Sequence, residues 1–493
     1  MAIENLTPET KAFFSLVSEA AFANPFSEHR VELDRKISGG SATLPWRDIV
    51  PEAVREVTRQ IEKLDADGAV KIQDFKQADH ELIEHVFLFD VFHQFVKQFD
   101  QLIADQINTD DEPILVPFAK DCIALLIKRG FSRDLANRYF SLFYQIRRAF
   151  HFIDQGLIGN CNSMRELRMN LWNNIFTHDI RYYERYLWDK MEDFSTLLLG
   201  PTGCGKGAAA AAIGRSGFIP FDEKKQTFAK SFTKTFISVN LSQFPETLLE
   251  SELFGHAKGA FTGAIDSHEG LFALCGPQGS IFLDEIGDVN PQVQIKLLQI
   301  LEERIFSPVG SHKKLKFQGR VIAATNKSLD QFRRKGKFRD DFYYRLCSDS
   351  IIVPSLHQRL QENPGELDEL IAHTVKRITG HKADELTKAV KNVIEKNLGK
   401  EYHWPGNVRE LAQCIRSVII KSHYAGDSAI ASYDFKTKLF TEIESGKLNA
   451  QNLLAAYCNI LYQKHRTYEQ VARVTKLDRR TVKKYIEHYL TEK

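Results

Sequence analysis

Hydrophobic and polar positions in the first 156 residues follow the period of an α-helix. Five apolar residues recur at spacings of four and three, which places them on one face of a helix. These residues are Leu88, Phe92, Phe95, Phe99 and Leu102. Ser132 is typical of a helix N-cap, and the residues after it repeat the same spacing. The pattern predicts a mostly helical N-terminal domain, residues 1–156, with a regulatory or sensor role and with its aromatic side chains in the core. A ligand-sensing pocket is the alternative for these aromatic residues, and no motif in the sequence supports it.

The pattern changes at about residue 157. Four short apolar runs, at 195–200, 235–240, 279–284 and 319–325, alternate with longer helical stretches. Such alternation is typical of a parallel α/β sheet. After Pro354 the strand-like runs stop, helical patterns continue to about residue 425, and a final helical set runs from about residue 449 to 490. The prediction is a multidomain protein with an α/β subdomain at 157–354, a helical subdomain at 355–427, and a linker and all-helical domain at 428–493.

Composition and charge narrow the function classes. The hydrophobic content of 43% and the charged content of 26% are those of an ordinary soluble protein. No apolar run approaches the ~18 residues that a membrane span needs, so no membrane partner is expected. The seven scattered cysteines lack metal-ligand spacing, which favours reduced thiols in a cytoplasmic protein.

Charge is unevenly distributed along the chain, although its net value is only +2. Residues 1–156 hold 25 acidic and 18 basic residues, a net charge of −7. Residues 461–493 hold 9 basic and 4 acidic residues, a net charge of +5. An acidic front and a basic end predict different roles for the two ends.

A glycine-rich segment follows the first apolar run of the α/β region. It reads G-P-T-G-C-G-K and stands between a predicted strand and a predicted helix. Glycines let successive backbone N–H groups point at phosphate oxygens, and the helix N-terminus adds the positive end of its dipole. Lys206 would reach the β- and γ-phosphates. The predicted nucleotide-binding residues are Gly200, Pro201, Thr202, Gly203, Cys204, Gly205, Lys206 and Gly207.

Paired acids end the third apolar run. Asp284 at the strand end would hold Mg²⁺, and Glu285 would polarise the attacking water. Gly207 lacks the hydroxyl with which many P-loops bind the metal, so the metal must rely on nucleotide oxygens, waters and an acid elsewhere. Adjacent acids on a surface loop are usually only solvated charges. Their position after a buried strand, downstream of a P-loop, favours ATP hydrolysis.

Positive charge is also needed on the leaving oxygens of a phosphoryl-transfer site. Arg339 and Arg345 lie six positions apart in a charged and aromatic stretch. From these residues alone, surface ion pairing is the favoured interpretation.

A further stretch points to a family. Residues 259–264 place an aromatic side chain between flexible glycines, which suggests a moving contact surface. This stretch resembles the signature loop of the AAA+ domains of sigma-54-dependent enhancer-binding proteins. The resemblance spans about residues 157–421. It recurs in order through the P-loop and the segments 284–288, 308–311, 323–326, 338–345 and 404–411.

The resemblance implies an AAA+ P-loop ATPase core whose lid is the helical subdomain at 355–427. Asn240 would restrain Glu285, and Asn326 would act as the first sensor of nucleotide. Arg409 would be the lid-domain sensor that contacts nucleotide. These roles imply ATP and Mg²⁺ as the ligands of the site.

Two further implications concern partners. Arg339 and Arg345 would reach into the site of a neighbouring subunit, so activity would require a ring, a hexamer by resemblance. The residues implied to contact sigma-54 are Gly259, Ala260, Phe261, Thr262, Gly263 and Ala264. Hydrolysis would move this loop and open the complex of promoter and sigma-54 RNA polymerase.

The basic C-terminal segment reads as a helix-turn-helix. Thr467 and Asp478 are predicted caps of two short helices, which Val471, Leu477 and Val482 would pack together. The second helix would enter the major groove of double-stranded DNA. Its predicted DNA-binding residues are Arg479, Arg480, Thr481, Lys483 and Lys484. A pair of basic solvated helices is the alternative, since the usual glycine of the turn is absent.

These features predict a sigma-54-dependent transcriptional activator, which binds upstream DNA, assembles a ring and spends ATP to remodel the polymerase. One alternative is a DNA-binding regulator that no longer engages sigma-54, although the intact loop at 259–264 counts against it. Another is an AAA+ remodelling ATPase that acts on a different protein. Specific DNA binding by residues 449–493 would argue against that second alternative.

Overall fold

The computed structural model describes residues 6–40, 46–66, 68–109, 111–399, 402–426, 443 and 449–491. It forms two compact units, one of Met1–Lys388 with Gly406–Ile415 and one of Ala389–Pro405 with Arg416–Lys493. The linker expected at the start of the segment 428–493 lies outside the described residues.

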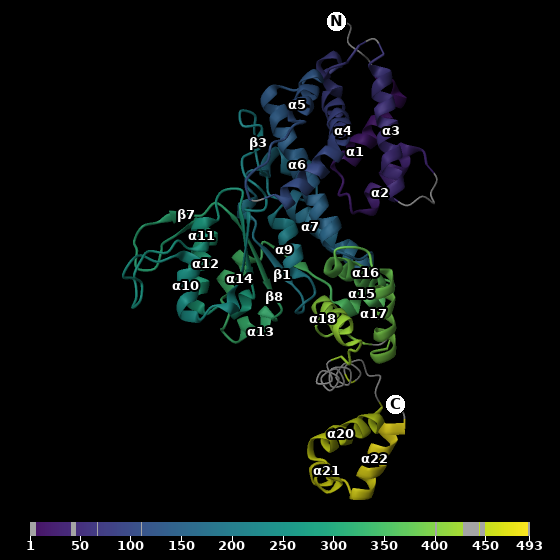
Figure 1. The fold of residues 1–493 in the computed structure, drawn as a ribbon, viewed down its shortest axis with the longest axis vertical. Helices are drawn as coiled ribbons and strands as arrows, with labels where there is room; N and C mark the ends of the chain where they lie inside the picture. The colour runs from purple at the N-terminus through teal and green to yellow at the C-terminus, as the bar shows by residue number, and fades with distance from the viewer. Residues whose placement is uncertain are drawn as a thin grey trace. The chain divides into compact units, whose positions relative to one another are not determined.

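The N-terminal region is helical, as its hydrophobic pattern predicts (Figure 1). Phe99 and Leu102 are buried in its core, and the Ser132 hydroxyl caps α6 by accepting a hydrogen bond from the Leu135 N–H. The helices are α1 (Pro8–Phe22), α2 (Glu28–Ser38), α3 (Trp46–Leu64), α4 (His80–Asn108), α5 (Ala119–Lys128) and α6 (Arg133–Gly156).

A five-stranded sheet with the order β4-β5-β8-β1-β9 follows, and all of its strand pairs are parallel. The strands are β1 (Thr196–Leu199), β4 (Phe236–Asn240), β5 (Ser280–Asp284), β8 (Arg320–Thr325) and β9 (Asp349–Ile352). The first four coincide with the predicted apolar runs. The edge strand β9 escaped prediction because its D-S-I-I sequence holds two polar residues among only four.

Helices flank the sheet and continue beyond it. Those around the sheet are α7 (Asn162–Phe176), α9 (Lys206–Gly214), α10 (Glu246–Phe254), α11 (Leu271–Leu274), α12 (Pro291–Glu303), α13 (Leu329–Arg334) and α14 (Asp340–Leu346). The helical stretch predicted after Pro354 consists of α15 (Leu356–Glu362), α16 (Glu366–Thr379), α17 (Asp384–Asn397) and α18 (Asn407–Lys421).

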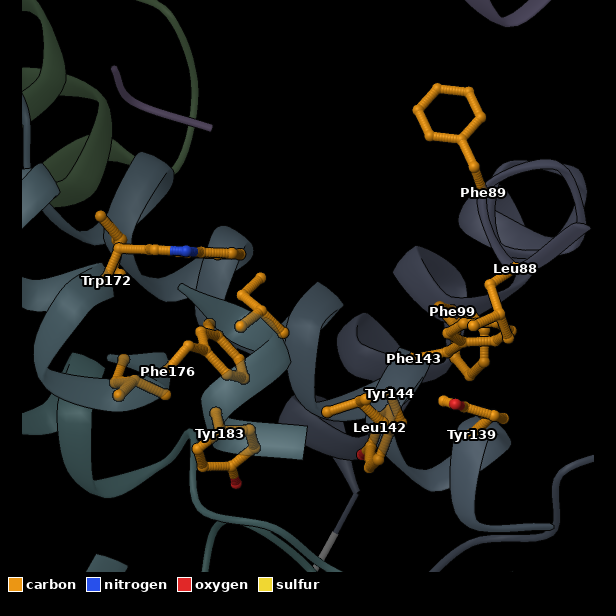
Figure 2. Packing of buried hydrophobic residues seen from close by; sticks show 14 of the residues in the cluster. Leu88, Phe89, Phe99, Tyr139, Leu142, Phe143, Tyr144, Trp172, Phe176 and Tyr183 are labelled. Carbon is orange, nitrogen blue, oxygen red and sulfur yellow. The ribbon is translucent and has the colours of Figure 1, made fainter. Parts of the chain in front are cut away.

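One hydrophobic cluster runs from the N-terminal helices onto one face of the sheet. It joins Phe140 of α6 to Ile213 of α9 and Phe282 of β5, and Figure 2 shows several of its aromatic side chains on α4, α6 and α7. A second cluster, with Ile281 and Leu283, covers the other face. Neighbouring residues of β5 thus enter different clusters, as the alternation of side chains along a strand requires.

The segment between α9 and β4 carries a small hairpin of β2 (Phe221–Asp222) and β3 (Thr227–Phe228). Phe228 stacks on Tyr144 of α6, with ring centroids 3.9 Å apart, and Phe221 meets Phe140 edge-on at 4.9 Å. The hairpin therefore packs against the N-terminal helices. A second hairpin, β6 (Ile305–Phe306) with β7 (Leu315–Lys316), follows α12.

The C-terminal helices α20 (Ala450–His465), α21 (Tyr468–Thr475) and α22 (Arg479–Thr491) form a core of their own. The buried residues of this core are Cys458, Leu461, Val471, Val482 and Ile486. The predicted cap Asp478 accepts hydrogen bonds from the N–H groups of Arg480 and Thr481, at 2.8 and 3.0 Å. Thr467 occupies the N-cap of α21 without a side-chain hydrogen bond. Lys476 ends α21 with a φ of +57°, in place of the usual glycine.

Candidate functional site

The site lies where the parallel strands end. Asn240 and Asp284 are register partners on β4 and β5, and Thr325 on β8 is aligned with Leu199, the last residue of β1. Asn326 follows β8, and the glycine-rich loop follows β1. The strand order β4-β5-β8-β1 therefore brings four predicted site segments to one edge of the sheet, where open α/β sheets bind ligands.

The glycine-rich loop connects β1 to α9. Gly203 and Gly205 have φ angles of +79° and +115°, which residues with a side chain rarely adopt. The buried Lys206 ammonium donates hydrogen bonds to the carbonyls of Gly200, at 2.8 Å, and Pro201, at 3.2 Å. A Cβ at Gly207 would meet no atom within 4 Å. The loop thus fixes its lysine in place, and sterics do not require a glycine at 207.

The paired acids have an unusual local geometry. Glu285 is a non-glycine residue with a φ of +58°, and its N–H donates to Asp284 Oδ1 at 3.0 Å. Strained conformations of this kind cost ~1–3 kcal/mol and cluster at functional sites. Glu285 Oε2 is buried and has no hydrogen-bond partner among the described residues. Because an unpaired buried oxygen is costly, it fits an acceptor that awaits a substrate water.

Asn240 lies beside Asp284, but its side chain is engaged elsewhere. Its Oδ1 accepts hydrogen bonds from the N–H of Ser242 at 3.0 Å and from the Ser242 hydroxyl at 2.7 Å. Within the described part of the chain no hydrogen bond joins Asn240 to Glu285. The restraint that the resemblance implies for Asn240 therefore stays a prediction.

Asn326 and the helical region after β9 both reach the glycine-rich loop. Asn326 Nδ2 donates to the Thr202 hydroxyl at 2.7 Å. A Cβ at Gly203 would lie 2.3 Å from the Gly406 carbonyl oxygen and 2.9 Å from Arg409 Cβ. The Cβ of Arg409 thus stands directly against the loop, and the contact of this residue with nucleotide stays a prediction.

Sequence reasoning missed Asn407, which ties α18 to the loop. Its Nδ2 donates to the Thr202 carbonyl at 3.0 Å, and its Oδ1 accepts from the Leu356 N–H at 2.7 Å. The side chain is 3% exposed. The signal was present in the motif at 404–411, but a sequence motif does not show which of its members is buried.

A buried ion pair holds the segment that precedes α7. Arg359 donates to Glu366 at 2.7 Å and to the Ile158 carbonyl at 2.5 Å, and Glu366 also accepts from the Cys161 N–H at 2.6 Å. Burial by itself would raise the pKa of Glu366, but the hydrogen bond from Cys161 and the charge of Arg359 outweigh it and lower that pKa. Sequence alone gave no sign of this pair.

Arg339 is the N-cap residue of α14, Arg345 lies in its last turn, and both have local partners. The exposed Arg339 guanidinium forms an ion pair with Asp341 at 2.6 Å, and its hydrogen bond lowers the pKa of that carboxyl. Arg345 donates twice to the Leu301 carbonyl, at 2.9 and 2.6 Å. Across the described residues neither arginine is hydrogen-bonded to the glycine-rich loop or to the paired acids.

The loop at 259–264 is closed by a backbone hydrogen bond, and β-bridges hold the residues that precede it. The Gly259 N–H donates to the Ala264 carbonyl at 2.8 Å, and Gly259 and Gly263 have φ angles of +79° and +100°. Before the loop, the backbone of His256 forms isolated β-bridges with His268 and with Val309. The tip carries Phe261, which is 39% exposed and lies 4.9 Å from the His256 ring.

The predicted DNA-binding residues line the start of α22. Arg479 pairs with Glu469 of α21 at 2.9 Å, and Lys483 lies 3.6 Å from Glu487. The Thr481 hydroxyl bonds to the Asp478 carboxylate and lowers its pKa. Arg480 and Lys484 are exposed. Exposed ion pairs are weak, so these cations remain available to another anion.

The structure bears on the expectations about membrane-spanning helices and about the cysteines. Of the helices described here, none is long and apolar enough to cross a membrane. All seven cysteines are free, and only Cys347 is less than fully buried.

Comparisons with known proteins match the middle of the chain. Residues 181–351 match the family described as the sigma-54 interaction domain, and residues 361–452 match the AAA+ ATPase lid domain. The nitrogen fixation protein AnfA of Azotobacter vinelandii is 37% identical over 252 residues, which cover 51% of this chain and 43% of that protein.

Two further relatives match a similar length. A Nif-specific regulatory protein of the same organism is 39% identical over 228 residues, covering 46% of this chain and 40% of its own. The transcriptional regulatory protein GlrR of Escherichia coli strain K12 is 36% identical over 240 residues, covering 49% and 50%. The chain thus spans half or less of the length of each of these relatives.

Proposed function

Residues 181–351 and 361–452 belong to the AAA+ ATPase domains of sigma-54-dependent transcriptional activators, and from this premise we propose that the whole chain is such an activator. It binds DNA upstream of a promoter, assembles a ring and uses ATP hydrolysis to remodel sigma-54 RNA polymerase. It acts in the cytoplasm. The observation that carries the proposal is the meeting of the glycine-rich loop, the paired acids and Asn326 at one sheet edge.

ATP binds with its phosphates on the loop at 200–207. Lys206 exchanges its hydrogen bonds to two loop carbonyls for contacts with the β- and γ-phosphates. Asp284 would hold Mg²⁺, which would supply charge neutralisation on the phosphate oxygens. Glu285 accepts a hydrogen bond from the attacking water at its unpaired Oε2 and orients that water. Asn326 and Arg409 report the state of the nucleotide to the rest of the subunit.

Completion of the site requires a neighbour. The surface position of Arg339 suits a residue that stabilises transition-state charge in the next subunit of a hexameric ring. Arg345 joins it after release from the Leu301 carbonyl. Hydrolysis then moves the loop at 259–264, whose exposed Phe261 and Thr262 contact sigma-54.

The C-terminal helices deliver the activator to DNA. Arg479, Arg480 and Thr481 stand at the N-terminal end of α22, and Lys483 and Lys484 follow on its exposed side. Basic side chains at the N-terminal end of a recognition helix reach phosphates and base edges in the major groove. A local net charge of +5 over residues 461–493 supports this role.

The test is ATP-dependent opening of a sigma-54 polymerase–promoter complex by the full chain. We expect the wild-type protein to open the complex and Glu285→Gln to lose hydrolysis by about two orders of magnitude or more, because its amide orients water poorly. Thr262→Ala should hydrolyse ATP normally and fail to open the complex. Ser267→Ala, at another exposed position after the same loop, is the matched control and should behave as wild type.

Two outcomes would count against the proposal. Robust ATPase activity with no opening by the wild-type chain would favour a remodelling ATPase with another protein substrate. Equal opening by Thr262→Ala and wild type would remove the loop from the contact with sigma-54.

A further inference from the structure

The N-terminal helices line a cavity of about 190 Å³ that is partly open to solvent. An apolar cavity of about 150 Å³ is large enough to bind benzene, so this one can hold a fused two-ring molecule. Its wall is mostly apolar and aromatic, with side chains from α1, α4, α6 and α7 that include Phe22, Leu88, Phe89, Phe143, Phe150 and Trp172. Four of these, Leu88, Phe89, Phe143 and Trp172, are labelled in Figure 2.

The charged residues in the wall are already neutralised. Arg30 binds Asp34 through Nε, at 2.9 and 3.0 Å, and also donates to the Ala20 carbonyl. Arg147 holds both carboxylate oxygens of Asp100, at 2.5 and 2.8 Å. Each cation is thus matched by its own carboxylate. A charged ligand would find no free counter-ion here and would have to give up its hydration, which disfavours anions and cations alike.

His93 gives the wall one polar acceptor. Its Nδ1 lies 2.8 Å from the Phe89 carbonyl oxygen, so Nδ1 carries the proton. Burial lowers the pKa of His93 to about 3, so the ring is neutral at physiological pH. In that tautomer Nε2 is a hydrogen-bond acceptor. A ligand that donates one hydrogen bond complements this wall.

We propose that this cavity is a binding site for a neutral, mostly apolar molecule of about two fused rings that donates one hydrogen bond to His93. All of the residues that line the cavity precede residue 181, where the first matched family begins, so binding stands apart from the proposed function. The class of ligand follows from the cavity volume, the paired cations and the His93 acceptor.

Two helices of the wall also contact the ATPase core. On α6, Ile146 and Phe150 line the cavity, while Arg148 donates to the carbonyls of Arg215, at 2.6 Å, and Gly217, at 2.7 Å, just after α9. On α7, Trp172 lines the cavity, and Asn174 donates to the Thr196 hydroxyl of β1 at 3.0 Å. A bound molecule therefore acts on the two elements that flank the glycine-rich loop. This second step rests on the proposed function.

The test is fluorine NMR on the full chain with three probes. The neutral donor is 5-fluoroindole, the matched probe without a donor is 5-fluorobenzothiophene, and the charged analogue is 5-fluoroindole-2-carboxylate. We expect saturable binding of 5-fluoroindole, and binding of the carboxylate weaker by about tenfold or more because its charge must be desolvated.

Variants locate the site and its polar contact. Val96→Trp and Ala21→Phe fill the cavity from different helices and should each weaken 5-fluoroindole by about tenfold or more, since the space is lost. His93→Phe should weaken 5-fluoroindole by about fivefold and leave 5-fluorobenzothiophene unchanged. Unchanged melting temperature and unchanged basal ATPase activity show that each variant is folded.

The proposal is overturned if no neutral probe binds saturably, if binding survives both filled variants, or if the carboxylate binds as well as the indole. If His93→Phe weakens the binding of both neutral probes equally, His93 does not accept a hydrogen bond from the ligand. Binding without any change in ATPase rate removes the transmission step and leaves the site itself intact.

Discussion

The N-terminal and C-terminal regions are both helical, yet they are built into the molecule in opposite ways. The N-terminal helices share one hydrophobic cluster with α9 and with a face of the sheet. The C-terminal helices α20, α21 and α22 close a small core of their own. Secondary structure alone therefore does not tell whether a helical region is an integral part of a core or a separate module.

Arg148 shows how closely the N-terminal region is joined to the α/β subdomain. Its guanidinium is fully buried and donates to the carbonyls of Arg215 and Gly217, beyond the C-terminus of α9. Burial lowers the pKa of Arg148 to about 10, so it remains a cation. The C-terminal end of a helix attracts a cation. The N-terminal region and the glycine-rich loop thus occupy opposite ends of one nine-residue helix.

The largest effect expected from this comparison comes from deletion. Removal of residues 1–156 would expose the apolar side of α9 and the hairpin residues Phe221 and Phe228 to water. We expect an aggregated protein without ATPase activity, measured by size-exclusion chromatography and phosphate release. Removal of residues 449–493 should leave a soluble ATPase, because the core lost with it is self-contained.

A point variant gives the C-terminal half of this comparison without truncation. Val482→Asp places a charge in the small core and should abolish DNA binding while ATPase activity persists. A soluble, active ATPase after deletion of 1–156 would show that the shared cluster is dispensable and would overturn the comparison.

Arg148→Met should have the next largest effect. The variant leaves two buried carbonyls without their donor, so we expect a loss of about 2–4 kcal/mol in the free energy of unfolding. Arg133→Met is the matched control on the same helix. Arg133 is exposed and forms an ion pair at 3.0 Å with Glu223, which lies in the turn between β2 and β3. Chemical denaturation followed by circular dichroism measures both. Equal midpoints for the two variants would show that the buried contact contributes little.

The smallest effect is a pH dependence confined to the N-terminal region. Burial lowers the pKa of His85 to about 4 and that of His93 to about 3, from 6.5. The unfolded chain binds these protons more readily, so this stability is complete above about pH 6.5 and is lost as the pH falls toward 4. The expected slope is ~1.4 kcal/mol per pH unit for each histidine.

Denaturation midpoints at about pH 7.5, 6.5 and 5.5 measure that slope. His85→Asn removes one of these groups and should reduce the slope by up to ~1.4 kcal/mol per pH unit, while the Ser18 hydroxyl that lies 2.8 Å from His85 Nδ1 keeps a polar neighbour. A slope that His85→Asn leaves unchanged would assign the pH dependence to other groups.

Much of the fold followed from sequence periodicity. Four of the five strands of the sheet, the helical N-terminal region and the cap at Asp478 were predictable because each depends on neighbours in the chain. β9 was not predictable, since its four residues become a strand only by pairing with β1. Thr467 does occupy the predicted N-cap of α21 but makes no side-chain hydrogen bond there, because the residue type does not ensure that bond.

The sequence by itself determined the chemistry available to this protein: a glycine-rich loop, paired acids at a strand end, a glycine-hinged aromatic loop and a basic C-terminal helix. The tertiary structure decided which residues distant in the chain come into contact. Packing brings Asn407 into contact with Thr202 and buries Arg148 of α6 against the carbonyls that follow α9. It also leaves a cavity among the aromatic side chains of the N-terminal helices. The physical reason is that a motif is a local pattern of residues, whereas burial and cavities arise from packing between segments distant in the chain.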